Sequence, residues 1–308
     1  MTPHQTAYPA VSVVLPTYNR AGSIRMAVES VLRQSFTDFE LLIIDDGSTD
    51  ATIAQLADIA DPRVHLLTNP RNMGASAARN TGIRAARADW VAFQDSDDEW
   101  LPQKLAKQMA RLAAAPRETV ACYCGMAIVG DPEGAPGFRT TVRYIPDGII
   151  TAVEGNLREP LLARSFISTQ MLVARRDALH EIGGFDEALP ALEDWDCVIR
   201  LSGAGPFAFV DEPLVLQYFS DNSITRSREK RVQALSCILD KHHGLLVPYP
   251  GVFANHLVSL AGARRHLGDH VGARRALAEA RRIRPTDLSI WARAVWLSMS
   301  AILPGRRP

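Results

Sequence analysis

The 308-residue chain lacks several features that mark particular classes of protein. Its longest apolar run, AVWLSMSAIL at 294–303, is shorter than the ~18–20 residues that a membrane-spanning helix needs. Its first ten residues, MTPHQTAYPA, have neither the basic nor the apolar part of a secretory signal. We therefore expect a cytoplasmic protein.

Neither charge nor cysteine gives the chain a distinctive composition. Lys and Arg together number 34, as do Asp and Glu, so overall charge gives no reason to expect a nucleic-acid partner. The four cysteines form no C-x-x-C pair, and a reduced setting is expected. With 47% hydrophobic and 22% charged residues, the chain is typical of a globular protein, and local motifs must indicate its function.

The first hundred residues alternate between apolar runs and helical patterns. The apolar runs are typical of buried parallel strands, and they lie at 11–16, 39–45, 64–68 and 90–94. The intervening helices are expected near 24–32, about 51–60 and after Gly74. This β-α order predicts an α/β fold with a doubly wound, mostly parallel sheet. No G-x-G-x-x-G follows the first strand, which disfavours a dinucleotide-binding site.

The remainder of the chain changes character near residue 226. Before that point we expect a helix over 100–116 and strands at 169–175 and 206–219. Beyond it the pattern is helical only, with Arg-rich amphipathic stretches. The sequence therefore predicts an α/β domain over 9–225 and an all-helical extension over 226–308.

Three of the expected strands end in polar or acidic segments, namely PTYN, DDGSTD and DSDD. Ligands of such sheets bind beyond the carboxyl ends of the strands. In DSDD, Asp95 and Asp97 form a D-x-D pair that can hold a divalent cation and, through it, a diphosphate. The alternative is a solvated acidic turn. We expect Asp98 and Glu99 at the exposed start of the following helix.

Other motifs also have ordinary structural interpretations. DDGSTD is common turn chemistry, although Asp45 and Asp46 also lie at the ligand-binding edge. EDWD (193–196) is typical of the acidic start of a helix, where carboxylates interact well with the helix dipole. GGFDE (183–187) alone indicates a glycine turn before a helix.

Taken together, these motifs resemble a known family. The chain is similar to family 2 glycosyltransferases over roughly residues 9–225, because six segments occur in that family's order and spacing: PTYNR, DDGSTD, RNMGASAARNTGI, DSDD, GGFDE and EDWD. The resemblance implies the GT-A fold, which binds nucleotide sugars. It also implies an inverting transfer of sugar from a nucleotide-diphosphate donor, with UDP preferred. The acceptor would be a hydroxyl of a glycan or glycolipid in cell-surface polysaccharide synthesis.

The resemblance also implies roles for individual residues. The residues implied to bind the nucleotide are Pro16, Thr17, Tyr18, Asp45, Asp46, Arg79 and Asp95. Of these, Asp46 matches the carboxylate that reads the base, and Asp95 the residue that reaches the ribose. Asp97, with Asp95 beside it, matches the ligand of Mn²⁺ or Mg²⁺. Asp194 matches the general base, with Glu193 as its neighbour.

Two alternative functions remain open at this stage. One is a non-catalytic scaffold that binds nucleotide sugars and acts through its helical tail, although intact Asp97 and Asp194 argue against it. The other is a sugar nucleotidyltransferase, but PTYNRAG lacks the Gly-rich loop of those enzymes. One departure from the family concerns metal or phosphate binding: Ser220 stands where relatives often have a His.

The helical extension has two possible interpretations in each of its parts. Gly268, Ala273, Ala280 and Pro285 fall where a tetratricopeptide repeat has its small residues and proline, so residues 255–285 form either such a unit or a generic hairpin. The segment 288–308 is either a capping helix or an interfacial amphipathic helix. We therefore expect 226–308 to contact the catalytic domain, a protein partner or the cytosolic face of the inner membrane.

Overall fold

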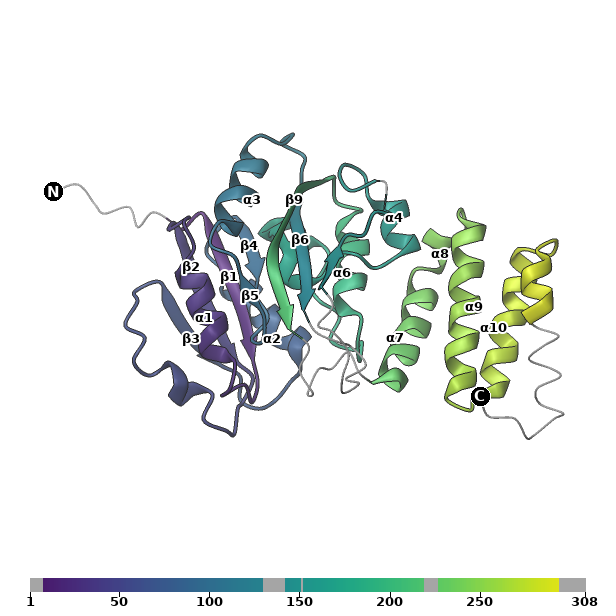
Figure 1. The fold of residues 1–308 in the computed structure, drawn as a ribbon, viewed down its shortest axis with the longest axis horizontal. Helices are drawn as coiled ribbons and strands as arrows, with labels where there is room; N and C mark the ends of the chain where they lie inside the picture. Colours follow the sequence, from purple (N-terminus) through teal and green to yellow (C-terminus); the bar gives the residue numbers. More distant parts are fainter. Residues whose placement is uncertain (1–7, 130–141, 151, 219–226, 294–308) are drawn as a thin grey trace. The chain divides into compact units, whose positions relative to one another are not determined.

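The chain forms two compact units in a computed structural model, which describes residues 8–129, 142–150, 152–218 and 227–293. The first unit comprises Met1–Glu187 with Glu193–Ser223, and the second Ala188–Leu192 with Ile224–Pro308. The first unit contains the sheet, and the elements labelled in the second are all helices (Figure 1).

The first unit is organised by a single mixed sheet. Its strand order is β3-β2-β1-β4-β8-β6-β9-β5, with β7 paired to β6. The strands are β1 (Val11–Thr17), β2 (Phe39–Asp45), β3 (Val64–Thr68), β4 (Trp90–Phe93), β5 (Glu99–Trp100), β6 (Ala121–Val129), β7 (Val142–Ile145), β8 (Leu172–Arg175) and β9 (Phe207–Tyr218). Strands β1 to β4 are parallel, β8 is antiparallel to β4 and β6, and β9 is parallel to β6. The four predicted parallel strands are thus confirmed.

Helices pack against this sheet and explain why its first strands are so apolar. The helices of the first unit are α1 (Ile24–Leu32), α2 (Ala75–Ala85), α3 (Lys104–Ala113), α4 (Arg158–Ala163), α5 (Arg176–Glu181) and α6 (Glu193–Leu201), with 3₁₀ turns η1 (Ile53–Leu56) and η2 (Thr169–Met171). Helix α2 contacts β1 and β2, and α3 contacts β6 and β9. Strands β1 and β2 are buried along their whole length, as expected of strands in a covered parallel sheet.

The prediction of a helix over about 51–60 is wrong, because only the short turn η1 forms there. Asp50 accepts hydrogen bonds from the Thr52 backbone N–H (2.9 Å) and hydroxyl, and the Thr52 Oγ1 accepts one from Arg20 N (2.7 Å). Such side-chain to backbone bonds offer the chain an alternative to helical hydrogen bonding. They also tie this segment to the turn after β1.

The strand register aligns the carboxyl ends of the parallel strands. Thr17 of β1 pairs with Asp45 of β2, which pairs with Thr68 of β3. Beside them, Gln94 N, just after β4, donates to Val14 O at 2.9 Å. The segments that follow these four strands therefore meet at one edge of the sheet.

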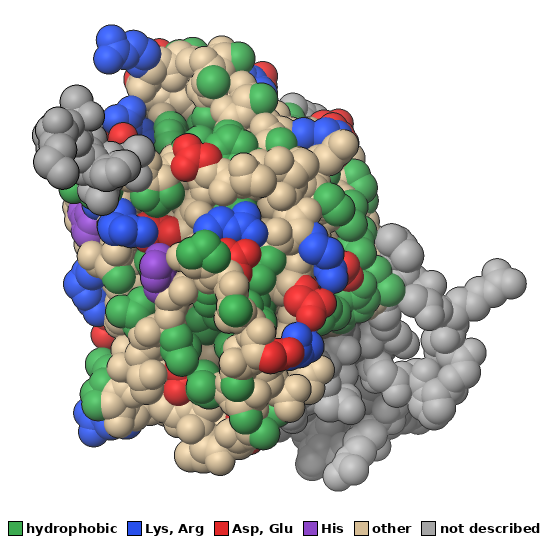
Figure 2. Space-filling view, turned by 90° about the vertical axis from the view of Figure 1, so that its left-hand side faces the viewer, with side chains coloured by type: hydrophobic (Ala, Val, Ile, Leu, Met, Phe, Trp, Pro, Cys, Tyr) green, Lys and Arg blue, Asp and Glu red, His purple; other side chains and the backbone are tan. Residues whose placement is uncertain are grey.

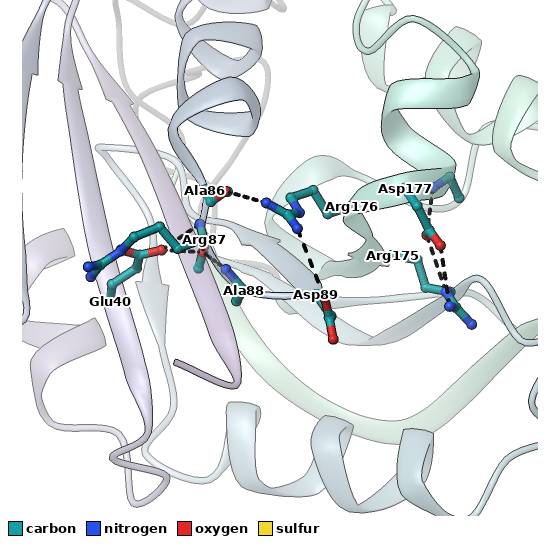
Figure 3. Close-up of polar contacts among 10 residues, drawn as sticks. Glu40, Ala86, Arg87, Ala88, Asp89, Arg175, Arg176 and Asp177 are labelled. Atoms are coloured by element: carbon teal, nitrogen blue, oxygen red, sulfur yellow. Dashed lines mark hydrogen bonds and ion pairs between the residues drawn. The ribbon is translucent and has the colours of Figure 1, made fainter. Parts of the chain in front are cut away.

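The opposite edge is held by a buried carboxylate (Figure 3). Glu40 accepts hydrogen bonds from the Ser12 hydroxyl (2.6 Å), Arg87 N (2.9 Å) and Arg87 Nε (2.7 Å). Although burial raises the pKa of Glu40, these bonds and the Arg87 charge outweigh it and lower that pKa. The contacts fix the turn between α2 and β4 against β1 and β2, and so set the position of α2 along the sheet.

Charged side chains are mixed on the face of the molecule that Figure 2 draws. Acidic and basic groups alternate over the described residues visible there, among hydrophobic and neutral ones. A nucleic-acid site needs a basic stripe, and this face does not present one among its described residues.

The second unit contains helices α7 (Arg228–Lys241), α8 (His243–Leu246), α9 (Pro250–His266) and α10 (His270–Ile283). Helices α9 and α10 form a hairpin, with Gly268 at φ +81° in the turn and Asp269 capping α10 through a 2.8 Å bond from Gly272 N. Buried Ala273 and Ala280 allow close packing. A helical hairpin is present as predicted, while its tetratricopeptide relationship stays a prediction.

Two predictions concern residues that the structure does not describe. Ser220 lies outside the described residues, and so does most of the segment 288–308, which is described only as far as Arg293. Among the described residues, no helix is both long enough and apolar enough to cross a membrane.

Candidate functional site

The end of β1 brings a buried hydroxyl next to an exposed aromatic ring. Pro16 and Thr17 are buried, whereas Tyr18 is 40% exposed. The Thr17 Oγ1 is buried and has no hydrogen-bond partner among the described residues. Buried polar atoms are normally satisfied, so this unpaired hydroxyl at the ligand-binding edge is a candidate contact for a bound group.

Asp46 holds the loop that precedes α2. Its carboxylate accepts hydrogen bonds from Asn69 Nδ2 (2.7 Å), Met73 N (3.0 Å) and Gly74 N (2.7 Å). Because a carboxylate has about four acceptor positions, one remains for a further donor. Asp45, beside it, accepts a 3.1 Å bond from Ser48 N. Both aspartates are buried at the predicted edge.

The four acids of DSDDE separate into different environments. Asp98 is only 2% exposed and accepts hydrogen bonds from Gln170 Nε2 (2.8 Å) and Tyr218 N (3.3 Å). Burial, with repulsion from Asp95 and Asp97, raises its pKa. Glu99 begins strand β5, and α3 starts only at Lys104. The prediction that Asp98 and Glu99 lie at an exposed helix start is therefore wrong, because β5 pairs with β9 and draws Asp98 inward.

Asp95 and Asp97 are the two acids of this group that stay partly accessible while facing arginines. Each side chain is 24% exposed. Asp95 Oδ1 lies 2.8 Å from Arg79 Nη2, and Asp97 Oδ2 lies 3.5 Å from Arg20 Nη2. The positive guanidinium groups offset the mutual repulsion of the two carboxylates.

Arg79 of α2 joins the end of β4 to the start of α6. Its Nη2 donates to Asp95 and its Nη1 donates to Glu193 Oε1 at 2.9 Å, while the guanidinium lies 5.4 Å from the Phe185 ring centre. Its side chain is 6% exposed, and although burial opposes the charged form, the two carboxylates raise its pKa. The structure therefore brings together Arg79, Asp95 and Glu193, which are distant in sequence.

Asp194 lies next to this ion-paired group in the first turn of α6. Burial, together with the neighbouring negative charge of Glu193, raises the pKa of Asp194 to about 7. The Trp195 backbone N–H donates to Asp194 Oδ1 at 2.7 Å and partly stabilises its charged form. The acidic helix start proposed for EDWD is thus present, and it places a carboxyl group that titrates near neutral pH beside Arg79.

The GGFDE segment is held in place from two helices. Asn80 of α2 donates to Phe185 O (2.9 Å) and Glu187 Oε1 (2.8 Å), and accepts from Phe185 N (2.8 Å). Arg200 of α6 donates to Ile182 O and Gly184 O, each at 2.7 Å, and is ion-paired with buried Asp196. These bonds fix the segment between the helices that carry Arg79 and Asp194.

Replacing Gly184 by alanine should therefore destabilise the first unit. Its φ is +70°, and an added Cβ would lie 2.4 Å from Asn80 Oδ1. We expect Gly184→Ala to lower the free energy of unfolding by about 2–3 kcal/mol, since both steric overlap and the left-handed backbone disfavour it. Denaturant unfolding measures this loss. Gly148→Ala is the control, because its Cβ meets nothing within 4 Å. Equal stability of the two variants would contradict the close packing of Gly184 against Asn80.

Asp95 and Asp97 have the chemistry of a divalent-cation site shared with a substrate. They are hard oxygen donors and remain partly accessible, whereas Asp98 is turned toward Gln170. Within the described residues, no group of three or more His, Cys, Asp and Glu side chains could enclose a metal by itself. Mg²⁺ and Mn²⁺ commonly take one or two carboxylates and complete their shell with phosphate oxygens and water, so these two residues fit such an ion.

Several residues that organise the site were missed from the sequence alone. They are Asn69, Asn80, Gln170 and Arg200. For Asn80 a signal was present: α2 is Ala-rich, yet it carries Ser76, Arg79 and Asn80 at helical spacing, and all three are buried. Buried polar residues on one face of a helix indicate partners from other segments.

Comparison with known protein families identifies the family of this chain. Residues 12–183 match the model of Glycosyl transferase family 2, and this is more than half of the chain. The chain therefore belongs to glycosyl transferase family 2, and the predicted family is confirmed.

Two curated proteins illustrate the relationship. Over 198 residues the chain is 35% identical to the succinoglycan biosynthesis protein ExoO of Rhizobium meliloti (strain 1021), covering 61% of this chain and 54% of that protein. Over 102 residues it is 40% identical to the UDP-Glc:alpha-D-GlcNAc-diphosphoundecaprenol beta-1,3-glucosyltransferase WfgD of Escherichia coli, covering 33% of this chain and 40% of that protein. The matches thus span about half or less of these relatives.

Solved structures confirm the GT-A-like fold. S. aureus TarS 1-349 in complex with UDP-GlcNAc has a TM-score of 0.63 at 16% identity, over 94% of this chain and 91% of that one. The mannosyltransferase PcManGT from Pyrobaculum calidifontis, in complex with GDP-Man and Mn²⁺, has a TM-score of 0.61 at 19% identity, over 96% and 81%. At such identities the likeness concerns the fold alone.

Proposed function

We propose that this protein is a metal-dependent, inverting glycosyltransferase that moves a sugar from a nucleoside-diphosphate donor to an acceptor hydroxyl. One observation carries the proposal. Arg79 joins Asp95, at the donor edge of the sheet, to Glu193, the neighbour of a carboxyl group with a pKa of about 7. The buried side chain of Arg79 thus joins a residue proposed to bind the donor to the neighbour of the residue proposed to remove the proton.

Asp194 serves as the general base in this proposal. An acceptor hydroxyl is a poor nucleophile, and a positioned carboxylate removes its proton as it attacks the anomeric carbon. A catalytic pKa near the working pH combines a large ionised fraction with useful basicity. Attack from the face opposite the leaving diphosphate inverts the anomeric carbon.

The donor lies across the carboxyl ends of β1, β2 and β4. The nucleoside contacts Pro16, Thr17 and Tyr18, and the unpaired Thr17 hydroxyl supports this placement. The base is read by Asp46, with Asp45 beside it. Asp95 would reach the ribose and, with Asp97, would hold Mn²⁺ or Mg²⁺, an ion that would supply positive charge to offset that of the departing diphosphate. Arg79 borders the nucleotide and orients Asp95.

The substrates follow from the relatives' names and remain proposals. ExoO is named for succinoglycan biosynthesis, and WfgD for transfer from UDP-Glc to a diphosphoundecaprenol-linked sugar. We therefore favour a UDP-sugar donor and a glycan or lipid-linked glycan acceptor, in the synthesis of a cell-surface polysaccharide. The domain limits, 9–225 for transfer and 226–308 for the helical extension, are part of this proposal, as is a protein or membrane partner for the extension.

The test is a panel of nucleotide sugars, assayed for release of the nucleoside diphosphate with glycan acceptors, in the presence and absence of Mn²⁺. We expect acceptor-dependent release from one donor class, and loss of that release when Mn²⁺ is chelated. Conversion of a nucleotide sugar and added pyrophosphate into a nucleoside triphosphate and a sugar 1-phosphate would contradict the proposal, as would no release from any donor.

The pH dependence of transfer should follow the titration of Asp194. Since the base must be ionised, kcat should rise with pH up to about 7 and level off above it. The rate measured at saturating donor and acceptor, between about pH 5 and 9, checks this. A value of kcat that does not change with pH through pH 7 would exclude Asp194 as the titrating base.

A further inference from the structure

The two units carry opposite charge, although the whole chain is neutral. Of the 34 Lys and Arg residues, 15 lie in the second unit, which holds only 5 of the 34 Asp and Glu residues. Its formal charge is therefore +10, and the first unit's is −10. A unit of this charge attracts anionic groups, so its exposed arginines are a candidate interaction surface.

The exposed face of α10 concentrates this charge. Arg274, Arg275 and Arg282 are exposed, and they make no ion pair or hydrogen bond within the described part of the chain. Helical spacing places them on the same side as Val271, which is 55% exposed. The opposite side of α10 is buried, through Gly272, Ala273, Ala276, Leu277 and Ala280.

Exposed apolar side chains also follow the end of α10. Leu288 is 80% exposed and Trp291 is 40% exposed. The Trp291 ring is held in place by the Arg281 guanidinium, 3.4 Å from its centre, and by a 2.7 Å bond from its Nε1 to Pro285 O. Exposed aliphatic and indole groups among arginines are typical of a lipid interface rather than of a polynucleotide site.

We propose that α10 and the segment after it, as far as Arg293, bind the surface of an anionic lipid bilayer. The arginines pair with lipid phosphates, since a guanidinium matches a phosphate with two parallel hydrogen bonds. Val271, Leu288 and Trp291 enter the boundary between headgroups and acyl chains. The proposal rests on the membrane contact proposed above for the extension, whose surface it names, and it does not depend on the transfer reaction.

The experiment measures co-sedimentation of the full chain with phosphatidylcholine vesicles that contain or lack phosphatidylglycerol. Wild type should bind the anionic vesicles, and salt should weaken this binding. The variant Arg274→Gln/Arg275→Gln/Arg282→Gln should bind them on the order of a hundredfold more weakly, because each cation near such a surface contributes roughly fivefold. Leu288→Ser should reduce the binding that persists at high salt.

The control removes the same charge from exposed arginines of the first unit, as Arg33→Gln/Arg84→Gln/Arg117→Gln. It should bind like wild type, and circular dichroism should show that both triple variants are folded. Equal weakening by the two triple variants would show an effect of net charge alone and overturn the proposal. The proposal would also be overturned if the wild-type protein does not bind anionic vesicles, or if it binds a polynucleotide instead.

Discussion

Asp194→Asn should reduce the rate of sugar transfer by about 10²–10⁴-fold while leaving nucleotide affinity nearly unchanged. Asparagine cannot accept the acceptor's proton, so the step that needs a base is lost. Its side-chain oxygen can still accept the 2.7 Å bond from Trp195 N, so the start of α6 should be retained. The measurements are kcat with saturating substrates and the Kd of the nucleoside diphosphate.

The matched control is Asp177→Asn, which changes an exposed acid in the first turn of helix α5. It removes the same charge from the same kind of helix position, and it should leave both kcat and Kd unchanged. An Asp194→Asn variant that transfers sugar at the wild-type rate would rule out the base assignment. A large loss of nucleotide affinity would instead place Asp194 on the donor.

Asp97→Asn should remove the dependence of nucleotide binding on Mn²⁺. Loss of a direct ligand should weaken Mn²⁺ binding by at least about 100-fold, which is the upper end for loss of a supporting residue. The fold should persist, because the 3.5 Å contact with Arg20 is partly exposed and such pairs contribute about 0–1 kcal/mol. Calorimetric titration of the nucleoside diphosphate, with and without Mn²⁺, measures the effect.

Asp89→Asn provides the comparison for this variant, since Asp89 is 95% exposed and lies at the opposite edge of the sheet (Figure 3). It should bind the nucleotide with the wild-type response to Mn²⁺. If Asp97→Asn also keeps that response, Asp97 is not a ligand of the ion. The ion would then be held by other groups, Asp95 among them.

The sequence predicts the parallel half of the sheet well because its signals are local. Mostly apolar runs at 11–16 and 39–45 favour strands covered on both faces, and the segments after parallel strands of one sheet meet at one edge. This rule predicts that PTYN, DDGSTD and DSDD lie at the same edge of the sheet. The pairing of Thr17 with Asp45 confirms this for the first two segments.

The second half of the sheet and the inner organisation of the site depend on long-range contacts. The short strand β5 forms only because β9, more than a hundred residues later, pairs with it, and this pairing buries Asp98. The bonds from Asn80 to the GGFDE segment likewise span more than a hundred residues. Local patterns of charge and hydrophobicity do not encode such pairings, so Asp98 was misplaced and Asn80 was missed.

Direct inspection of the product stereochemistry tests the central claim that Asp194 drives a single displacement. With the donor selected from the nucleotide-sugar panel, NMR of the newly formed glycoside reports the configuration of its anomeric carbon. The account predicts the configuration opposite to that of the donor. A product that retains the donor's configuration would contradict it, because one attack assisted by one base cannot give that outcome.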